Sequence, residues 1–168
     1  MKLLFENWRK YLNYVPSERT QTYQIYCDMD GVLVDFIGGA VNYITNKLQS
    51  GEAEELKAEI DRDYVDGEDI GGNKVVKRFM YKELQHHANF WRDLEWMPDG
   101  KQLWNHIAPY NPYVLTAPMG YGSEIGKQEW IDNNLNPPPP EKIYMSHDKY
   151  RWAVTNGKPN ILIDDFSK

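Results

Sequence analysis

The sequence predicts an α/β fold in which a three-layer core is built around a parallel sheet and a small helical cap is inserted after the first strand. Short apolar runs alternate along the chain with longer segments whose apolar residues recur at helical spacing, a pattern typical of this class. Two of the apolar runs end in aspartates, at residues 28–30 and 164–165. The length of 168 residues is enough for one such core with a small insertion, but not for two full-sized domains.

Four short apolar segments are the predicted strands. The first contains Ile25-Tyr26-Cys27 and stands directly before an Asp-rich turn. The other three are residues 112–116, 143–145 and 159–163. Strands that alternate with helices usually pair in parallel, and parallel sheets bind ligands at the carboxyl ends of their strands. The residues that follow these four segments are therefore the first candidates for a functional site.

The segments between and around the strands are the predicted helices, at residues 4–15, 36–48, 52–60, 75–84, 98–107 and 123–135. Ser123 is the predicted N-cap of the last one. The expected organisation has three parts: an N-terminal amphipathic helix with its linker (residues 1–20), a core in two pieces (21–40 and 98–168) and a helical cap (41–97). The N-terminal helix either packs on the body of the protein or docks a partner.

The composition disfavours several classes of protein. The net charge of -6 argues against a protein that binds duplex nucleic acid, because such a protein needs basic residues to replace phosphate counterions. Cys27 is the single cysteine, so neither an intrachain disulfide nor a thiolate metal cage can form. No apolar run is long enough to span a membrane, and charge interrupts the N-terminal apolar stretch too early for a signal peptide. We expect a cytoplasmic protein, with the question of a homodimer left open.

Chemically active side chains follow all four predicted strands. Asp28 and Asp30 come after the first strand, Thr116 ends the second, Lys149 follows the third, and Asp164-Asp165 ends the fourth. Parallel strands would bring these groups to one edge of the sheet. Bunched carboxylates persist only with a cation or with shifted pKa values, and hard oxygen ligands without cysteine or paired histidine favour Mg²⁺. A carboxylate beside such an ion is also a competent nucleophile toward phosphorus.

Other polar residues give weaker signals. The acidic loop at residues 61–67 lacks an oxygen ligand at its fifth position, where Val65 stands, so it is not a calcium loop of the EF-hand type. Lys127, Lys142 and Lys158 also lie near the second half of the sheet. Most lysines only solvate a surface, and the position of Lys149 just after a strand favours it over these three.

Several stretches resemble a known family. Asp28-Met29-Asp30-Gly31-Val32-Leu33 resembles the first motif of the haloacid dehalogenase (HAD) superfamily of phosphohydrolases, and Leu115-Thr116, Lys149 and Asp164-Asp165 resemble its second, third and fourth motifs. The four stand in the family's order. A narrower resemblance, to the 5'(3')-deoxyribonucleotidase branch, adds Asn89-Phe90-Trp91, Pro98-Asp99-Gly100 and Val114-Leu115-Thr116-Ala117-Pro118. Together these stretches span most of the chain from Tyr23 onward.

The resemblance implies a Rossmann-like core and an enzyme that hydrolyses phosphate monoesters with Mg²⁺. It implies that Asp28 is the nucleophile and a metal ligand, and that Asp30 is the acid/base and gives its backbone carbonyl to the metal. It implies that Thr116 and Lys149 hold the phosphoryl group. Asp164 would ligate the metal, with Asp165 supporting it, and Phe36 would face the nucleoside of a nucleoside monophosphate. Phe90 and Trp91 are interpreted either as a wall of the substrate pocket or as ordinary core.

Two departures from the family leave alternatives open. Residues 50–85 do not match the family's cap, so the base and sugar are unspecified, and a sugar phosphate or a polynucleotide end is an alternative substrate. The chain stops at Lys168, where relatives continue, as expected either of a minimal version or of a chain that lacks its C-terminal end. The rival outside the enzymes is a non-catalytic module that uses the N-terminal helix for protein contacts. The presence of all the catalytic residue types disfavours it.

Overall fold

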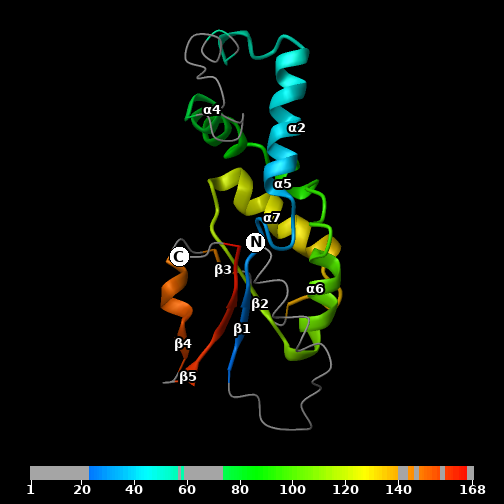
Figure 1. Cartoon of the computed structure of the whole chain (residues 1–168), viewed down its shortest axis with the longest axis vertical. Coiled ribbons are helices and arrows are strands. Elements are labelled where there is room, and N and C mark those ends of the chain that lie inside the picture. Colours follow the sequence, from blue (N-terminus) through cyan, green and yellow to red (C-terminus); the bar gives the residue numbers. More distant parts are fainter. Residues whose placement is uncertain are drawn as a thin grey trace.

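The computed structural model describes residues 23–56, 58, 74–139, 144–145, 148–155 and 158–165. At its centre lies a four-stranded sheet in the order β3-β2-β1-β6 (Figure 1). Its strands are β1 (Ile25–Cys27), β2 (Tyr113–Thr116), β3 (Tyr144–Met145) and β6 (Ile161–Ile163). All three pairings are parallel. The predicted α/β class, its parallel sheet and the positions of its four strands are confirmed. The N-terminal segment predicted as a helix and linker lies outside the described residues.

The two faces of the sheet differ in what they contact. Cys27 pairs in register with Val114, and both belong to the buried core that includes residues of α6 (Gly100–Ile107) and α7 (Tyr121–Asn134). Tyr26 pairs with Tyr113, and successive strand residues point to opposite faces. The Tyr26 ring lies 5.6 Å from the ring of Trp152, in the short helix η2 (Lys149–Trp152). The helices therefore cover one face, and an aromatic cluster lies on the other.

The remaining elements follow the predicted order with three differences. They are α2 (Phe36–Gln49), α4 (Lys74–Leu84), α5 (Ala88–Arg92), η1 (Ala108–Tyr110), β4 (Val154–Thr155) and β5 (Lys158–Pro159). Neither the one-turn helix α5 nor the β4–β5 hairpin was predicted, because both are too short to show a period. The predicted N-cap at Ser123 is wrong: α7 begins at Tyr121, and the Ser123 hydroxyl accepts hydrogen bonds from the N–H groups of Met119 and Gly120.

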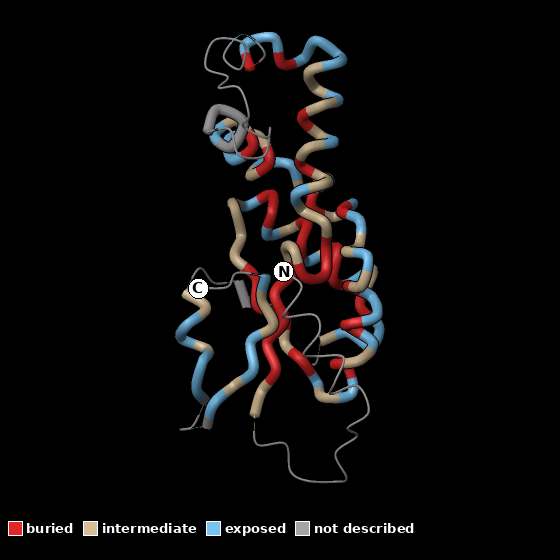
Figure 2. Tube along the Cα trace, viewed as in Figure 1, coloured by how far each residue is buried: buried red, intermediate tan, exposed pale blue. Residues whose placement is uncertain are grey.

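Tryptophans supply much of the core, as the aromatic content predicts. Trp91, Trp104 and Trp130 are the three largest fully buried side chains. Each indole N–H donates to a backbone carbonyl, of Leu84, Pro137 and Leu94 respectively, so burial leaves no donor unpaired. Figure 2 shows the buried residues running from the sheet into the base of α2. None of the helices that the structure describes is long and apolar enough to cross a membrane.

The region predicted as the cap extends from the carboxyl end of the sheet. Figure 1 shows α2 and α4 beyond that end, with α5 lying against α7 below them. Backbones approach closely at this junction, because a Cβ on Gly126 of α7 would lie 2.1 Å from the carbonyl oxygen of Ala88. The Gly122 N–H also donates to the Gln85 carbonyl over 2.9 Å. The stem of the cap is therefore packed directly onto the core.

Substituting Gly126 with Ala is expected to destabilise the protein by about 1–3 kcal/mol, since the added methyl forces α5 and α7 apart. Urea unfolding of Gly126→Ala measures the loss. The exposed Gln128→Ala on the same helix is the control, with an expected change within about 0.5 kcal/mol. Equal stability of Gly126→Ala and wild type would contradict the close packing of α5 on α7.

Candidate active site

The carboxyl edge of the sheet gathers side chains from several distant segments. Asp28 follows β1, and its N–H donates to the Ile163 carbonyl at the end of β6 over 2.8 Å. Because Cys27 and Ile163 are in register, the next residues, Asp28 and Asp164, leave the sheet side by side. The expectation that the predicted strand-end residues converge at one edge is confirmed for these two aspartates.

Three carboxylates lie close enough to share one cation. One oxygen each of Asp28, Asp164 and Asp165 falls within 4.8 Å of the others. Asp28 is 5% exposed, and the other two are more accessible. Three like charges at this separation repel one another unless a cation balances them. The carboxylate of Asp30 is outside this group, and the ligand predicted from that residue is its backbone carbonyl.

Lys149 supplies one positive charge to the cluster. Its Nζ lies 2.5 Å from Asp28 Oδ2 and 2.8 Å from Asp164 Oδ2. Burial alone would lower the pKa of Lys149, but the two neighbouring carboxylates outweigh it and raise the pKa above its usual value. The lysine is therefore protonated and bridges two of the three carboxylates. The prediction that Lys149 belongs to the site, made from its position just after a strand, agrees with this geometry.

One lysine does not relieve the whole cluster. Burial raises the pKa of Asp28 to about 6, although the Coulombic attraction and hydrogen bond of Lys149 lower it, and Asp30 and Asp164 add to the rise. Burial, followed by the charge of Asp164, also raises the pKa of Asp165. Both shifts indicate that the ionised cluster is costly and that a second cation would stabilise it.

The turn after β1 fixes the direction of Asp28. The N–H groups of Leu33 and Val34 both donate to the Met29 carbonyl, over 2.8 and 3.0 Å, and close the turn. The Met29 N–H donates to Asp28 Oδ1 over 2.8 Å. Gly31 has a φ of +72°, and a Cβ there would lie 2.4 Å from Asp165 Oδ2. Glycine is thus needed both for the backbone conformation and for the approach of Asp165.

Lys127 also belongs to the site, and the sequence-based expectation that it solvates the surface is wrong. Its side chain is fully buried. The ammonium donates to Asp30 Oδ2 over 2.6 Å, to Thr116 Oγ1 over 2.9 Å and to the Ala117 carbonyl over 3.1 Å. A signal for it was present: residues 123, 127, 130 and 131 form a stripe of helical period, and all four are buried. A lysine within such a stripe must have a partner.

Of the aromatic residues predicted to contact the substrate, Trp91 lies beside this lysine, and Phe36 and Phe90 pack against Trp91. Phe36 is partly exposed and stacks on Trp91 at a centroid distance of 5.1 Å and an interplanar angle of 6°. Trp91 is fully buried, and Lys127 Nζ lies 4.9 Å from its ring centroid. Phe90 lines a cavity of about 440 Å³ between α2 and α5. Trp91 therefore supports Phe36 and Lys127 and is not itself accessible to a ligand.

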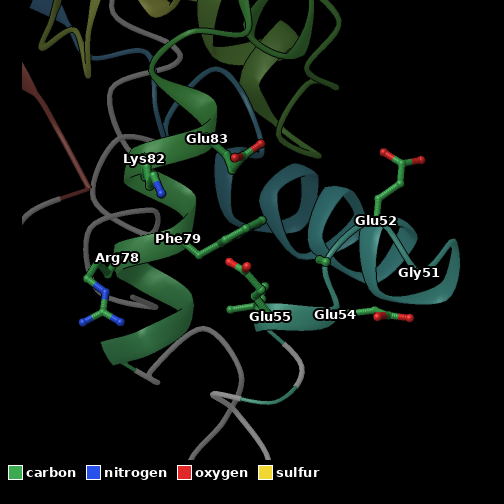
Figure 3. A pocket seen from close by; sticks show the side chains of 10 residues that line it. Gly51, Glu52, Glu54, Glu55, Arg78, Phe79, Lys82 and Glu83 are labelled. Atoms are coloured by element: carbon green, nitrogen blue, oxygen red, sulfur yellow. The ribbon is translucent and has the colours of Figure 1, made fainter.

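A larger cavity, of about 680 Å³, lies higher in the cap between residues 51–56 and α4. Figure 3 shows Phe79 and Glu55 facing each other across it, with Arg78 and Lys82 on the other side of α4. None of the strand-end residues lines this cavity. The chemically active groups are therefore at the sheet edge and not in this larger cavity. No protein-family model matches the chain.

Proposed function

We propose that the chain is a Mg²⁺-dependent phosphohydrolase that uses Asp28 as its nucleophile, as its motifs resemble those of the HAD superfamily. The observation that supports this best is the trio of Asp28, Asp164 and Asp165 within 4.8 Å at the carboxyl edge of a parallel sheet, with Lys149 bridging the first two. A complete three-layer Rossmann-like core, a cap that covers the site and a cytoplasmic location belong to the same proposal.

The donor set fits a hard divalent cation. Its side chains offer carboxylate oxygens only, which favours Mg²⁺ over zinc or copper. Asp28, Asp164 and Asp165 would hold the ion, together with the backbone carbonyl of Asp30. When bound, Mg²⁺ would neutralise charge on the phosphoryl oxygens. The raised pKa values of Asp28 and Asp165 support the proposal, because a cation bound here would stabilise both carboxylates in their ionised form.

The chain's own residues can carry both halves of the reaction. In the first half, an Asp28 oxygen forms a bond to phosphorus while the bond from phosphorus to the leaving oxygen breaks, and Asp30 gives that oxygen a proton. In the second half, Asp30 takes a proton from water as the water attacks the aspartyl-phosphate. Inorganic phosphate leaves, and Asp28 is regenerated. Lys149 and the Thr116 hydroxyl would stabilise the charge on the phosphoryl oxygens.

A nucleoside monophosphate is the proposed substrate. The partly exposed Phe36, supported by Trp91, offers a ring on which a base can stack, and aromatic faces bind bases without a strong sequence preference. A sugar phosphate or a polynucleotide end is the alternative, and no specific observation favours either. The non-catalytic alternative does not explain why the charged residues Asp28 and Lys127 are buried at this edge of the sheet.

Phosphate release from a panel of nucleoside monophosphates and sugar phosphates tests both parts of the proposal. We expect turnover with Mg²⁺, a loss of at least ~1,000-fold with chelator, and a preference for nucleotides. A clear preference for sugar phosphates would overturn the substrate. Absence of any turnover across the panel with Mg²⁺ would overturn the enzyme.

A further inference from the structure

The hydrogen bonds of Lys127 divide the carboxylate of Asp30 into two unlike oxygens. Oδ2 accepts from the buried ammonium over 2.6 Å. Oδ1 is buried and has no hydrogen-bond partner among the described residues. A buried acceptor without a hydrogen-bond partner is unfavourable, and the large majority of buried side-chain polar atoms have one. Oδ2 is thus fixed by a hydrogen bond, whereas Oδ1 is buried and accepts no hydrogen bond from the described residues.

Lys127 itself is held firmly. Its three N–H donors have three acceptors, on Asp30, Thr116 and Ala117, and its Nζ also lies 4.9 Å from the ring centroid of Trp91. A fully buried ammonium with every donor occupied has little freedom to rotate. The ammonium is therefore held in place by the protein and not by solvent, and it fixes the position of the carboxylate oxygen of Asp30 to which it donates.

We propose that Lys127 is a positioning residue for the reaction: it holds Asp30 Oδ2 so that Oδ1 is left to exchange the proton with the leaving oxygen and with water. The inference rests on the proposed function. In the first half-reaction the proton passes from Asp30 to the leaving oxygen as its bond to phosphorus breaks. In the second half-reaction water returns a proton to Asp30. Lys127 exchanges no proton and forms no bond in either step.

The dependence on the leaving group separates this role from a structural one. An alkoxide such as that of a nucleoside needs a proton to leave, whereas a nitrophenolate does not. The value of kcat/KM includes only steps up to departure of the leaving group when that step is irreversible. Loss of a well-placed acid is expected to lower kcat/KM for a nucleoside monophosphate by ~100-fold or more and that for p-nitrophenyl phosphate by less than ~5-fold.

The test compares wild type with Lys127→Met, which keeps the length of the side chain but removes its charge and donors. Loss of the contact to Thr116 lowers kcat/KM for both substrates alike, so the ratio between the substrates isolates the effect on Asp30. We expect this ratio to change by at least ~20-fold, the quotient of the two expected losses. The exposed Lys101→Met on α6 should leave it unchanged. Adding Lys127→Met to Asp30→Asn should not move the ratio beyond the value for Asp30→Asn alone.

Each outcome decides the assignment. An unchanged ratio in a folded Lys127→Met protein overturns it, even when wild type is fully active. If Lys127→Met does not fold, Lys127→Gln replaces it, because the shorter, uncharged amide keeps a polar group in the buried site but loses the charged hydrogen bond to Asp30, and the same change in the ratio is expected. Failure of both variants to fold also overturns the assignment, because Lys127 is then a structural residue. A wild type that releases phosphate from neither substrate contradicts the proposed function itself.

Discussion

Asp28→Asn is expected to stop phosphate release and, at the same time, to stabilise the metal-free protein. Activity should fall by ~1,000-fold or more, because an amide does not form the aspartyl-phosphate. The stability follows from the pKa of Asp28, which burial raises from 3.8 to about 6. The stabilising contribution of the neutral carboxyl is complete below its pKa in the unfolded chain, and it is lost as the pH rises through the pKa in the folded protein.

The shift corresponds to about 3 kcal/mol of stability that the ionised carboxylate loses above pH ~6. An asparagine carries no charge at any pH, so the variant avoids this cost. The pKa of about 6 already includes the attraction of Lys149, so we expect a net gain of up to about 3 kcal/mol at pH ~8 in chelator, vanishing near pH ~4. Urea unfolding at the two pH values measures it.

Asp132→Asn is the matched control, because Asp132 is an exposed aspartate on α7 outside the site. It should keep full activity and change stability by less than about 0.5 kcal/mol at either pH. Turnover by Asp28→Asn would refute the nucleophile. A destabilised Asp28→Asn at pH ~8 would show that the cluster is not strained without metal.

Asp164→Asn is expected to remove most of the binding of Mg²⁺. A ligand that binds only the folded state stabilises it by about 2.7 kcal/mol when its concentration is 100 times its Kd. Wild type should therefore become more stable as Mg²⁺ is added, since the ion relieves the repulsion among Asp28, Asp164 and Asp165. The variant lacks one of these three ligands, and its stability should depend little on Mg²⁺.

Thermal unfolding across a Mg²⁺ titration measures this difference without any substrate. We also expect kcat/KM of Asp164→Asn to fall by ~100-fold or more at a fixed Mg²⁺ concentration. The exposed Glu124→Gln on α7 removes a carboxylate away from the site and should respond to Mg²⁺ as wild type does. An identical Mg²⁺ response in Asp164→Asn and wild type would exclude Asp164 as a ligand.

Much of this site could be predicted because its positions follow from strand order alone. Parallel pairing places every strand's carboxyl end at one edge, so Asp28 and Asp164 meet even though 136 positions separate them in the sequence. The turn after β1 could be predicted from its own residues, Asp30 and Gly31, because glycine readily adopts the positive φ that is found there. These features depend on the sequence near each strand and on one topological rule.

The features that could not be predicted depend on packing between helices. The helical stripe at residues 123, 127, 130 and 131 indicates that Lys127 lies on the buried face of α7, but only the packing of α7 brings it to Asp30 and Thr116. The sequence does not decide whether Trp91 is a pocket wall or part of the core, and only the packing of α5 on α7 places it under Phe36. The cavity in the cap likewise depends on how α4 approaches residues 51–56, which no local pattern encodes.

The central claim is that phosphate is transferred to the carboxylate of Asp28. The most direct measurement is to quench the enzyme during turnover, reduce any acyl-phosphate with borohydride, and find the modified residue by mass spectrometry. The account predicts a modified peptide that contains position 28, formed only with Mg²⁺ and absent from Asp28→Asn. Rapid phosphate release with no modification of that peptide, or modification at another carboxylate, would contradict it.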